Sequence, residues 1–209
     1  MAKEPTKGER TRERILDVAQ GIVLSKGFSG TSIDEIIAAA EITKGGFFYH
    51  FRGKADLARE LMRRYLEQDD VFFKDLSARA HDLVDDPLQR LLVFLKLLAN
   101  AMGDLPETHP GCLIASFTYE SQQFDPEVRQ LAADGVAGWR RLFVELLEPV
   151  AARYPMKEEV ALEVLADHLS AIFEGGILLS RTMDDSSILV SQLLQFRQHI
   201  RLLFGDLDR

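Results

Sequence analysis

Several features that would point to other classes of protein are missing from this sequence. Its 209 residues include one cysteine, which excludes an intramolecular disulfide framework and a cysteine-rich zinc module. With 14 glycines and 7 prolines the chain is neither collagen-like nor of low complexity. Its apolar runs are short, as at 91–95 and 177–179. We therefore expect no membrane span, and the N-terminal residues lack the apolar stretch of a secretory signal.

Motifs of common enzymes are missing as well. Gly53-Lys54 is followed by Ala55 and not by Ser or Thr, so the motif of a nucleotide-binding loop is not matched. The Gly-x-Ser-x-Gly motif of serine hydrolases is also absent. No two histidines stand three or four residues apart, as a helical metal pair requires. Paired acids at 69–70, 85–86 and 184–185 are expected at helix ends, as solvated caps. The sequence thus predicts no enzyme, no metal site and no cofactor.

Charge is present but unevenly distributed. Residues 1–66 hold 12 Lys or Arg and 9 Asp or Glu, a net charge of +3. Residues 67–209 have a net charge of −11, so the whole chain carries −8. A basic N-terminal piece on an acidic body suggests that only the first piece meets a polyanion such as DNA.

Apolar residues recur at three- and four-residue spacing through most of the chain, which predicts an all-α protein without a sheet. A first helix is expected over 9–25, stopped by Gly27. A second follows an N-cap at Thr31 or Ser32, and a third runs from Thr43 to about Tyr49. The remaining helices are expected near 55–80, 87–103, 111–123, 126–152, 157–181 and 186–204.

The three short helices have the layout of a helix-turn-helix, with the third as recognition helix. Phe47, Phe48 and Phe51 are expected to pack on the first two helices, which leaves small and polar residues facing outward. Gly45-Gly46 inside a helix costs about 1 kcal/mol per glycine relative to alanine. Close approach to DNA would explain that cost, and the alternative is that the pair forms a turn.

Residues 10–57 resemble the DNA-binding domain of the TetR/AcrR family of transcriptional regulators. The matching segments are 11–19, 26–28, 31–36 and 43–57. The aromatic run through Phe51, followed by Lys54 and Leu57, is the most specific part. The resemblance implies a helix-turn-helix DNA-binding domain over 1–54, joined to a larger helical ligand-binding and dimerisation domain over 55–209.

The resemblance also implies which residues meet double-stranded DNA. Contacts to phosphates are expected from Thr31, Thr43, Tyr49 and Lys54. Nearest the major groove we expect Lys44, Gly45, Gly46 and His50. In a dimer, two recognition helices about one DNA turn apart, ~34 Å, would read a palindromic operator.

The resemblance further implies a homodimer through the last two long helices and a small-molecule effector inside the larger domain. Wide apolar stripes over 160–179 and 186–204 fit such a dimer, and an ordinary intramolecular core fits them equally well. The expected pocket residues, most of which would be core in any helical protein, are Phe94, Met102, Cys112, Phe117, Trp139, Phe143, His168 and Phe173.

Cys112 follows Pro110-Gly111 and is expected at the start of a helix, where a thiolate is stabilised. The segment 111–114 resembles one found in many family members, including regulators that sense electrophiles or oxidants through a cysteine. The alternative for Cys112 is a small side chain that packs in the core.

Together these features predict a cytoplasmic, ligand-responsive regulator. It would repress transcription by binding a palindromic operator as a homodimer, until a small-molecule effector or modification of Cys112 releases it. The alternative is a helical protein-interaction module without sequence-specific DNA binding, which predicts no dependence on duplex sequence or salt.

Overall fold

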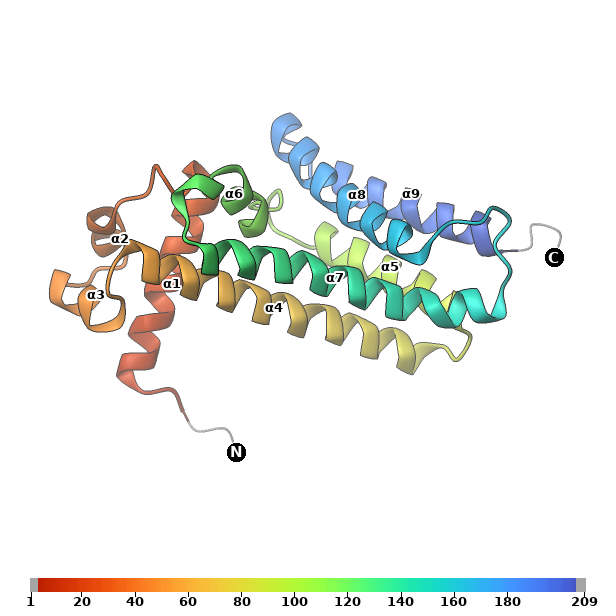
Figure 1. The fold of residues 1–209 in the computed structure, drawn as a ribbon, viewed down its shortest axis with the longest axis horizontal. Helices are drawn as coiled ribbons and strands as arrows, with labels where there is room; N and C mark the ends of the chain where they lie inside the picture. The colour runs from red at the N-terminus through yellow and green to blue at the C-terminus, as the bar shows by residue number, and fades with distance from the viewer. Residues whose placement is uncertain (1–3, 206–209) are drawn as a thin grey trace. The chain divides into compact units, whose positions relative to one another are not determined.

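The computed structural model describes residues 4–205, which are largely helical and contain no strand (Figure 1). The all-α prediction is confirmed. The outer ends of the two predicted domains, 1–3 and 206–209, lie outside the described residues. In chain order the helices are α1 (Lys7–Lys26), α2 (Ile33–Ala39), α3 (Lys44–His50), α4 (Lys54–Leu83), α5 (Pro87–Gly103), α6 (Leu113–Tyr119), the 3₁₀ turn η1 (Ser121–Gln123), α7 (Pro126–Arg153), α8 (Leu162–Met183) and α9 (Ser187–Phe204).

The chain divides into two compact units. Unit 1 comprises Met1–Gln68 and Pro110–Gly135, and unit 2 comprises Asp69–His109 and Val136–Arg209. Both α4 and α7 run through the two units. Unit 1 therefore holds α1, α2, α3 and the start of α4 together with α6 and the start of α7, a grouping that apolar spacing did not predict.

Local side chains explain where the first helices begin and end. Thr6 and Glu9 form a capping box at the start of α1, and Gly27 ends that helix with φ 83°, a conformation that glycine adopts without strain. The hydroxyl of Ser32 accepts a hydrogen bond from the Glu35 N–H, so Ser32 is the N-cap of α2. Thr43 caps α3 in the same way.

Three predicted boundaries were wrong. The helix expected over 111–123 is divided into α6 and η1. Helix α8 begins at Leu162 instead of 157, and the Lys157 N–H before it donates to the Leu203 carbonyl at 3.0 Å. Residues 69–70 lie inside α4 and not at a helix end, because the apolar register of α4 continues past them to the buried Phe73 and Leu76.

The core of unit 2 forms where α9 packs against α5 and α8. Glycine is needed at Gly176 because a Cβ there would lie 2.7 Å from the side chain of Leu189. The predicted α9 stripe is therefore mainly intramolecular core, through the buried residues Leu189, Leu193, Phe196, Ile200 and Leu203.

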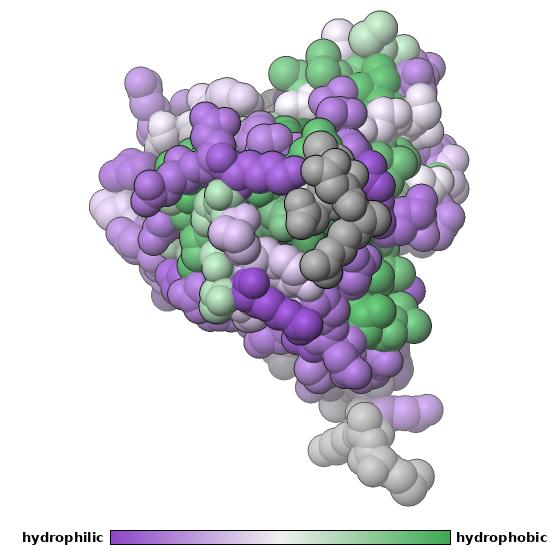
Figure 2. Space-filling model, turned by 90° about the vertical axis from the view of Figure 1, so that its right-hand side faces the viewer, coloured by the Kyte–Doolittle hydropathy of each residue, from purple (hydrophilic) through white to green (hydrophobic). Residues whose placement is uncertain are grey.

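Other large hydrophobic residues of α8 and α9 stay exposed. They are Val164, Leu178, Leu179, Met183 and Leu202. Figure 2 shows patches of hydrophobic residues, in green, that reach the surface among hydrophilic ones. None of the helices in residues 4–205 combines the length and the apolar composition needed to cross a bilayer.

Candidate nucleic-acid interface

Helix α3 presents one apolar face to unit 1. Phe47 and Phe51 are buried there, with ring centroids 5.6 Å apart. The expectation that Phe48 also packs inside was wrong, since its side chain is 46% exposed. The physical reason is helical periodicity: Phe48 lies about 100° around the helix axis from Phe47, whereas Phe51 lies one turn further along.

The other face of α3 is open. Tyr49 is 82% exposed, Lys44 and Gly45 are exposed, and His50 is half-buried. Lys44 Nζ lies 3.6 Å from Asp34 Oδ1 in an exposed ion pair, which costs little to exchange for a phosphate. Six of the eight predicted DNA-binding residues therefore share α3 or its cap: Thr43, Lys44, Gly45, Gly46, Tyr49 and His50.

The two glycines lie in the first turn of α3, so the alternative that they form a turn was wrong. A Cβ at Gly45 would meet nothing nearer than the Thr43 hydroxyl at 4.0 Å. Packing within the described chain therefore does not require glycine at Gly45. At Gly46 a Cβ would lie 3.3 Å from that hydroxyl and would crowd the cap.

The other two predicted residues, Thr31 and Lys54, lie around the turn between α1 and α2. Thr31 is 3% exposed, and its hydroxyl donates to the Gly27 carbonyl at 2.7 Å, so this group closes the turn. Lys54 begins α4, with its Nζ 4.4 Å from the centroid of the Phe28 ring and 3.5 Å from the Ser29 carbonyl oxygen. Partial burial lowers the pKa of Lys54.

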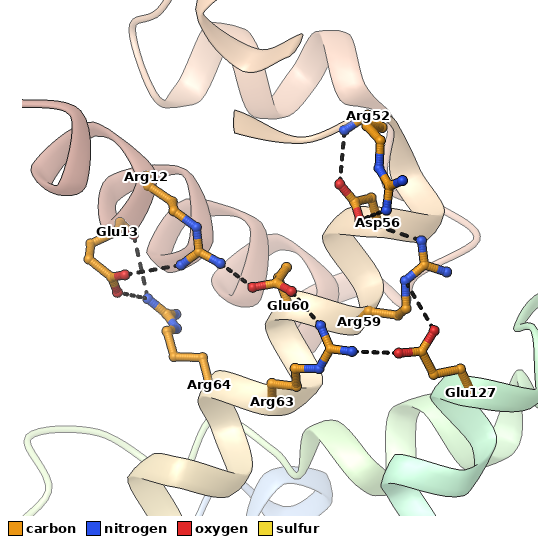
Figure 3. Close-up of polar contacts among 9 residues, drawn as sticks. All are labelled: Arg12, Glu13, Arg52, Asp56, Arg59, Glu60, Arg63, Arg64 and Glu127. Carbon is orange, nitrogen blue, oxygen red and sulfur yellow. Dashed lines mark hydrogen bonds and ion pairs between the residues drawn. The ribbon is translucent and has the colours of Figure 1, made fainter. Parts of the chain in front are cut away.

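Behind α3, arginines and carboxylates cross-link α1, α4 and the start of α7 (Figure 3). Arg12 of α1 pairs with Glu60, and Arg63 joins Glu60 to Glu127 of α7 at 2.6 and 2.5 Å. Hydrogen bonds from Arg52 are the main cause that lowers the pKa of Asp56 to about 2. Much of the basic charge counted in the sequence is thus paired with carboxylates inside unit 1.

The predicted effector-pocket residues are divided between the units. Cys112 and Phe117 belong to unit 1, where Cys112 is the N-cap of α6 and its Sγ accepts from the Ala115 N–H at 3.5 Å. In unit 2 the rings of Phe94 and Phe143 lie 6.4 Å apart. The other members belong to unit 2: Met102 is buried, Trp139 and Phe173 are half-buried, and His168 is exposed beside His199.

Unit 2 also has an open cleft of about 490 Å³ between α4, α5 and α7, a volume in the range of small-molecule sites. Its floor includes Leu91 and Leu146, which also line a narrow apolar void beside Phe143. Charged and apolar side chains share its walls, among them Lys74, Arg90, Leu142 and Glu145.

Two half-buried titratable groups of unit 2, Asp69 and His109, were not predicted from the sequence. Burial raises the pKa of Asp69 to about 7, against a hydrogen bond from Trp139. Burial, and then the charge of Arg181, lowers the pKa of His109 to about 4. Both residues look like ordinary surface groups in the sequence, and only the packing around them reveals that their charged forms are disfavoured.

Two family models match the chain. The model described as bacterial regulatory proteins, tetR family, matches residues 15–61, and that described as tetracyclin repressor-like, C-terminal domain, matches residues 87–195. The HTH-type transcriptional repressor DhaR of Mycobacterium sp. (strain GP1) is 25% identical over 182 residues, which cover 85% of this chain and 83% of that protein.

Further similarity extends over nearly the whole fold. The HTH-type transcriptional regulator LmrA of Bacillus subtilis (strain 168) is 27% identical over 184 residues, 86% of this chain and 91% of that protein. A crystal structure of a TetR transcriptional regulator from Chloroflexus aurantiacus superposes with a TM-score of 0.77 and 25% identity, covering 95% of this chain and 98% of that one.

Proposed function

The chain belongs to the TetR family of bacterial regulatory proteins, which are DNA-binding transcriptional regulators and not enzymes, and from this premise we propose that it represses transcription from a palindromic operator as a homodimer in the cytoplasm. The resemblance carried by residues 10–57 is thereby confirmed. The division into a DNA-binding domain over 1–54 and a ligand-binding and dimerisation domain over 55–209 is part of the proposal.

The open face of α3 is the observation that carries DNA binding. Exposed Tyr49, Lys44 and Gly45 form a surface that combines a phosphate-bonding hydroxyl, a cation and a position without a side chain. Thr31 and Lys54, around the neighbouring turn, would add phosphate contacts.

Selection from a random duplex library at two salt concentrations tests this proposal. We expect a palindrome to be enriched, with affinity that falls steeply as salt rises. Tyr49→Ala should weaken binding about tenfold without loss of stability, since the side chain is 82% exposed. Failure to enrich any motif at low salt, from protein shown to be free of ligand, would favour the protein-interaction module instead.

The exposed hydrophobic residues of α8 and α9 support the dimer. A Cβ at Gly175 would meet no described atom within 4 Å, so a second copy could approach the backbone closely there. Leu178, 62% exposed, lies one turn further along α8. Leu178→Glu should convert the dimer to a monomer in sedimentation, whereas Val71→Glu, at a similarly exposed residue of α4, should not.

We propose that a small molecule with an apolar part binds the larger domain, where the cleft over Leu91 and Leu146 and the aromatic residues Phe94 and Phe143 are candidate contacts. Release then follows if the effector prefers a state that does not bind the operator. A thermal-shift screen tests the site: Leu146→Trp should abolish a hit that binds in the cleft.

Modification of Cys112 is the second proposed route of release. The thiol is 7% exposed and caps α6, so an adduct on Sγ would remove a helix cap inside unit 1. Because the chain has one cysteine, Cys112→Ser gives a thiol-free control. N-ethylmaleimide should release operator from the wild type and leave the Ser variant bound; release from both would exclude this route.

A further inference from the structure

A carboxylate from outside the predicted DNA-binding domain closes the turn between α1 and α2. Glu120 follows α6, and its Oε1 accepts a hydrogen bond from the Phe28 N–H at 2.8 Å. Its Oε2 accepts from the Ser29 N–H at 2.7 Å and from the Ser29 hydroxyl. These two N–H groups lie outside any helix, so Glu120 supplies the acceptors that they would otherwise lack within the turn.

The turn is shaped to admit this carboxylate. Gly27 has φ 83°, and a Cβ added there would collide with Glu120 Oε1. The backbone conformation therefore favours glycine at this position, and the absence of a Cβ also leaves room for the Glu120 carboxylate as it stands.

An aromatic cluster holds the same segments together. The Phe28 ring, 5% exposed, lies 5.4 Å from the ring of Phe117 and 4.6 Å from that of Phe124. Phe117 and Phe124 flank Glu120 in the sequence and stack on each other at 4.2 Å. Apolar and polar contacts from one short segment thus fix the position of Phe28.

The side chain of Lys54 contacts Phe28 and Ser29, the two residues that the segment around Glu120 holds in place. Its ammonium lies over the face of the Phe28 ring at 4.4 Å and reaches the Ser29 carbonyl at 3.5 Å. The negative charge of Glu120 attracts it as well. Movement of the turn would therefore displace the Phe28 ring and the Ser29 carbonyl that the Lys54 ammonium contacts.

We infer that Glu120 is a positioning residue for DNA binding, which holds the α1–α2 turn as the platform from which Lys54 meets a phosphate. The inference rests on the proposed function. By charge alone, a carboxylate beside a DNA-binding lysine should oppose binding, whereas the positioning role of Glu120 favours it. Charge and position therefore predict opposite effects when Glu120 is replaced.

Affinity and salt dependence, measured on the duplex that the wild-type protein selects, separate the two effects. Glu120→Ala, and to a smaller extent Glu120→Gln and Ser29→Ala, should weaken binding, by about tenfold for the loss of one phosphate contact. The slope of log affinity against log salt should become shallower by about 1 in Glu120→Ala. Lys54→Ala should do the same, and the double variant should be no weaker than Lys54→Ala alone.

Glu127→Gln is the matched control. It removes the same charge from the same unit, but its carboxylate pairs with Arg63 of α4 and not with the turn. Its affinity should stay within about twofold of the wild type. Amide exchange should quicken at Phe28 and Ser29 in Glu120→Ala while the interior of α1 stays protected, which distinguishes a loosened turn from an unfolded domain.

Unchanged or tighter binding by Glu120→Ala, or a loss that adds fully to that of Lys54→Ala, would overturn the inference while leaving the proposed function intact. If the wild-type protein itself selects no duplex, the proposed function fails, and this inference fails with it.

Discussion

The two compact units hold their ionisable groups in opposite ways. In unit 1 hydrogen bonds from Arg52 lower the pKa of Asp56 to about 2. In unit 2 burial raises the pKa of Asp69 to about 7 and lowers that of His109 to about 4. Unit 1 thus uses charge pairs as a scaffold behind α3. In unit 2, desolvation disfavours the charged forms of Asp69 and His109, as is common at sites that recognise small molecules.

The largest effect that would test this comparison is expected at Arg64 of α4. Its side chain is 11% exposed, with Nη1 2.7 Å from Asp17 Oδ1 and Nη2 2.9 Å from Gln20 Oε1, both on α1. Arg64→Ala should lower the free energy of unfolding by about 2–3 kcal/mol, through lost packing and lost charge-assisted hydrogen bonds. Chemical denaturation measures this change.

Arg64→Lys is the matched variant, because it keeps the charge but cannot divide two nitrogens between Asp17 and Gln20. It should recover part of the loss. A loss below about 0.5 kcal/mol for Arg64→Ala would show that unit 1 does not depend on its charge pairs.

The second effect is a pH dependence from Asp69 in unit 2. Its folded pKa of about 7 lies above the ordinary 3.8, so the folded chain binds more protons than the unfolded chain between those values. The contribution of Asp69 to stability should fall as pH rises from 4 to 7 and then level off. Asp69→Asn should remove this fall and be about 1–2 kcal/mol more stable than the wild type at pH 8.

The same titration should show the Asp69-dependent difference between Asp69→Asn and the wild type disappearing below pH 3.8, where the carboxyl becomes protonated in the folded and the unfolded chain. His109 acts in the other direction. Its lowered pKa makes stability fall as pH drops through 6.5 toward 4. Asp69→Asn and the wild type should both show this contribution, since both retain His109. A wild type whose stability is flat from pH 6.5 to 8, and equal to that of Asp69→Asn, would contradict the assignment.

The third effect comes from Asp56 and has the opposite sign to that of Asp69. The depressed pKa of Asp56 adds stability that is fully present above pH 4 and lost as pH falls toward 2. Asp56→Asn should cost about 1 kcal/mol at pH 7, with allowance for solvent screening, and should flatten the acid limb. If the loss of stability below pH 4 were unchanged by the substitution, Asp56 would not contribute to the stability of unit 1 through its ion pairs.

Sequence patterns predicted the helices of this fold better than the contacts between residues far apart in the chain. Apolar spacing located the helices, and Gly27, Ser32 and Thr43 marked ends through cap chemistry that is local in the chain. The contacts of Glu120 with Phe28 and Ser29 span more than ninety residues, and no periodicity reports them.

Burial was hardest to predict where neighbouring residues have the same chemistry. Phe47 and Phe48 are adjacent phenylalanines, yet one is buried and the other 46% exposed. Asp69 and Asp70 are adjacent acids, yet Asp70 is exposed and pairs with Lys74 at 2.8 Å, whereas Asp69 is half-buried and its pKa is raised. A one-residue step around a helix decides such cases, and the helix register is known only once its packing is known.

The smallest effect is expected at the ion pair with the best geometry. In unit 2, Arg140 binds both oxygens of Asp167 at 2.7 Å, but each side chain is about half exposed. Solvent screens such a pair, and fixing two long side chains costs entropy, so Arg140→Ala should leave the melting temperature unchanged within error. Should it cost as much as Arg64→Ala, geometry and not burial would set the value of these pairs. Unit 2 would then rely on charge as unit 1 does, and the contrast between a scaffold of charge pairs and an interior that disfavours charge would not hold.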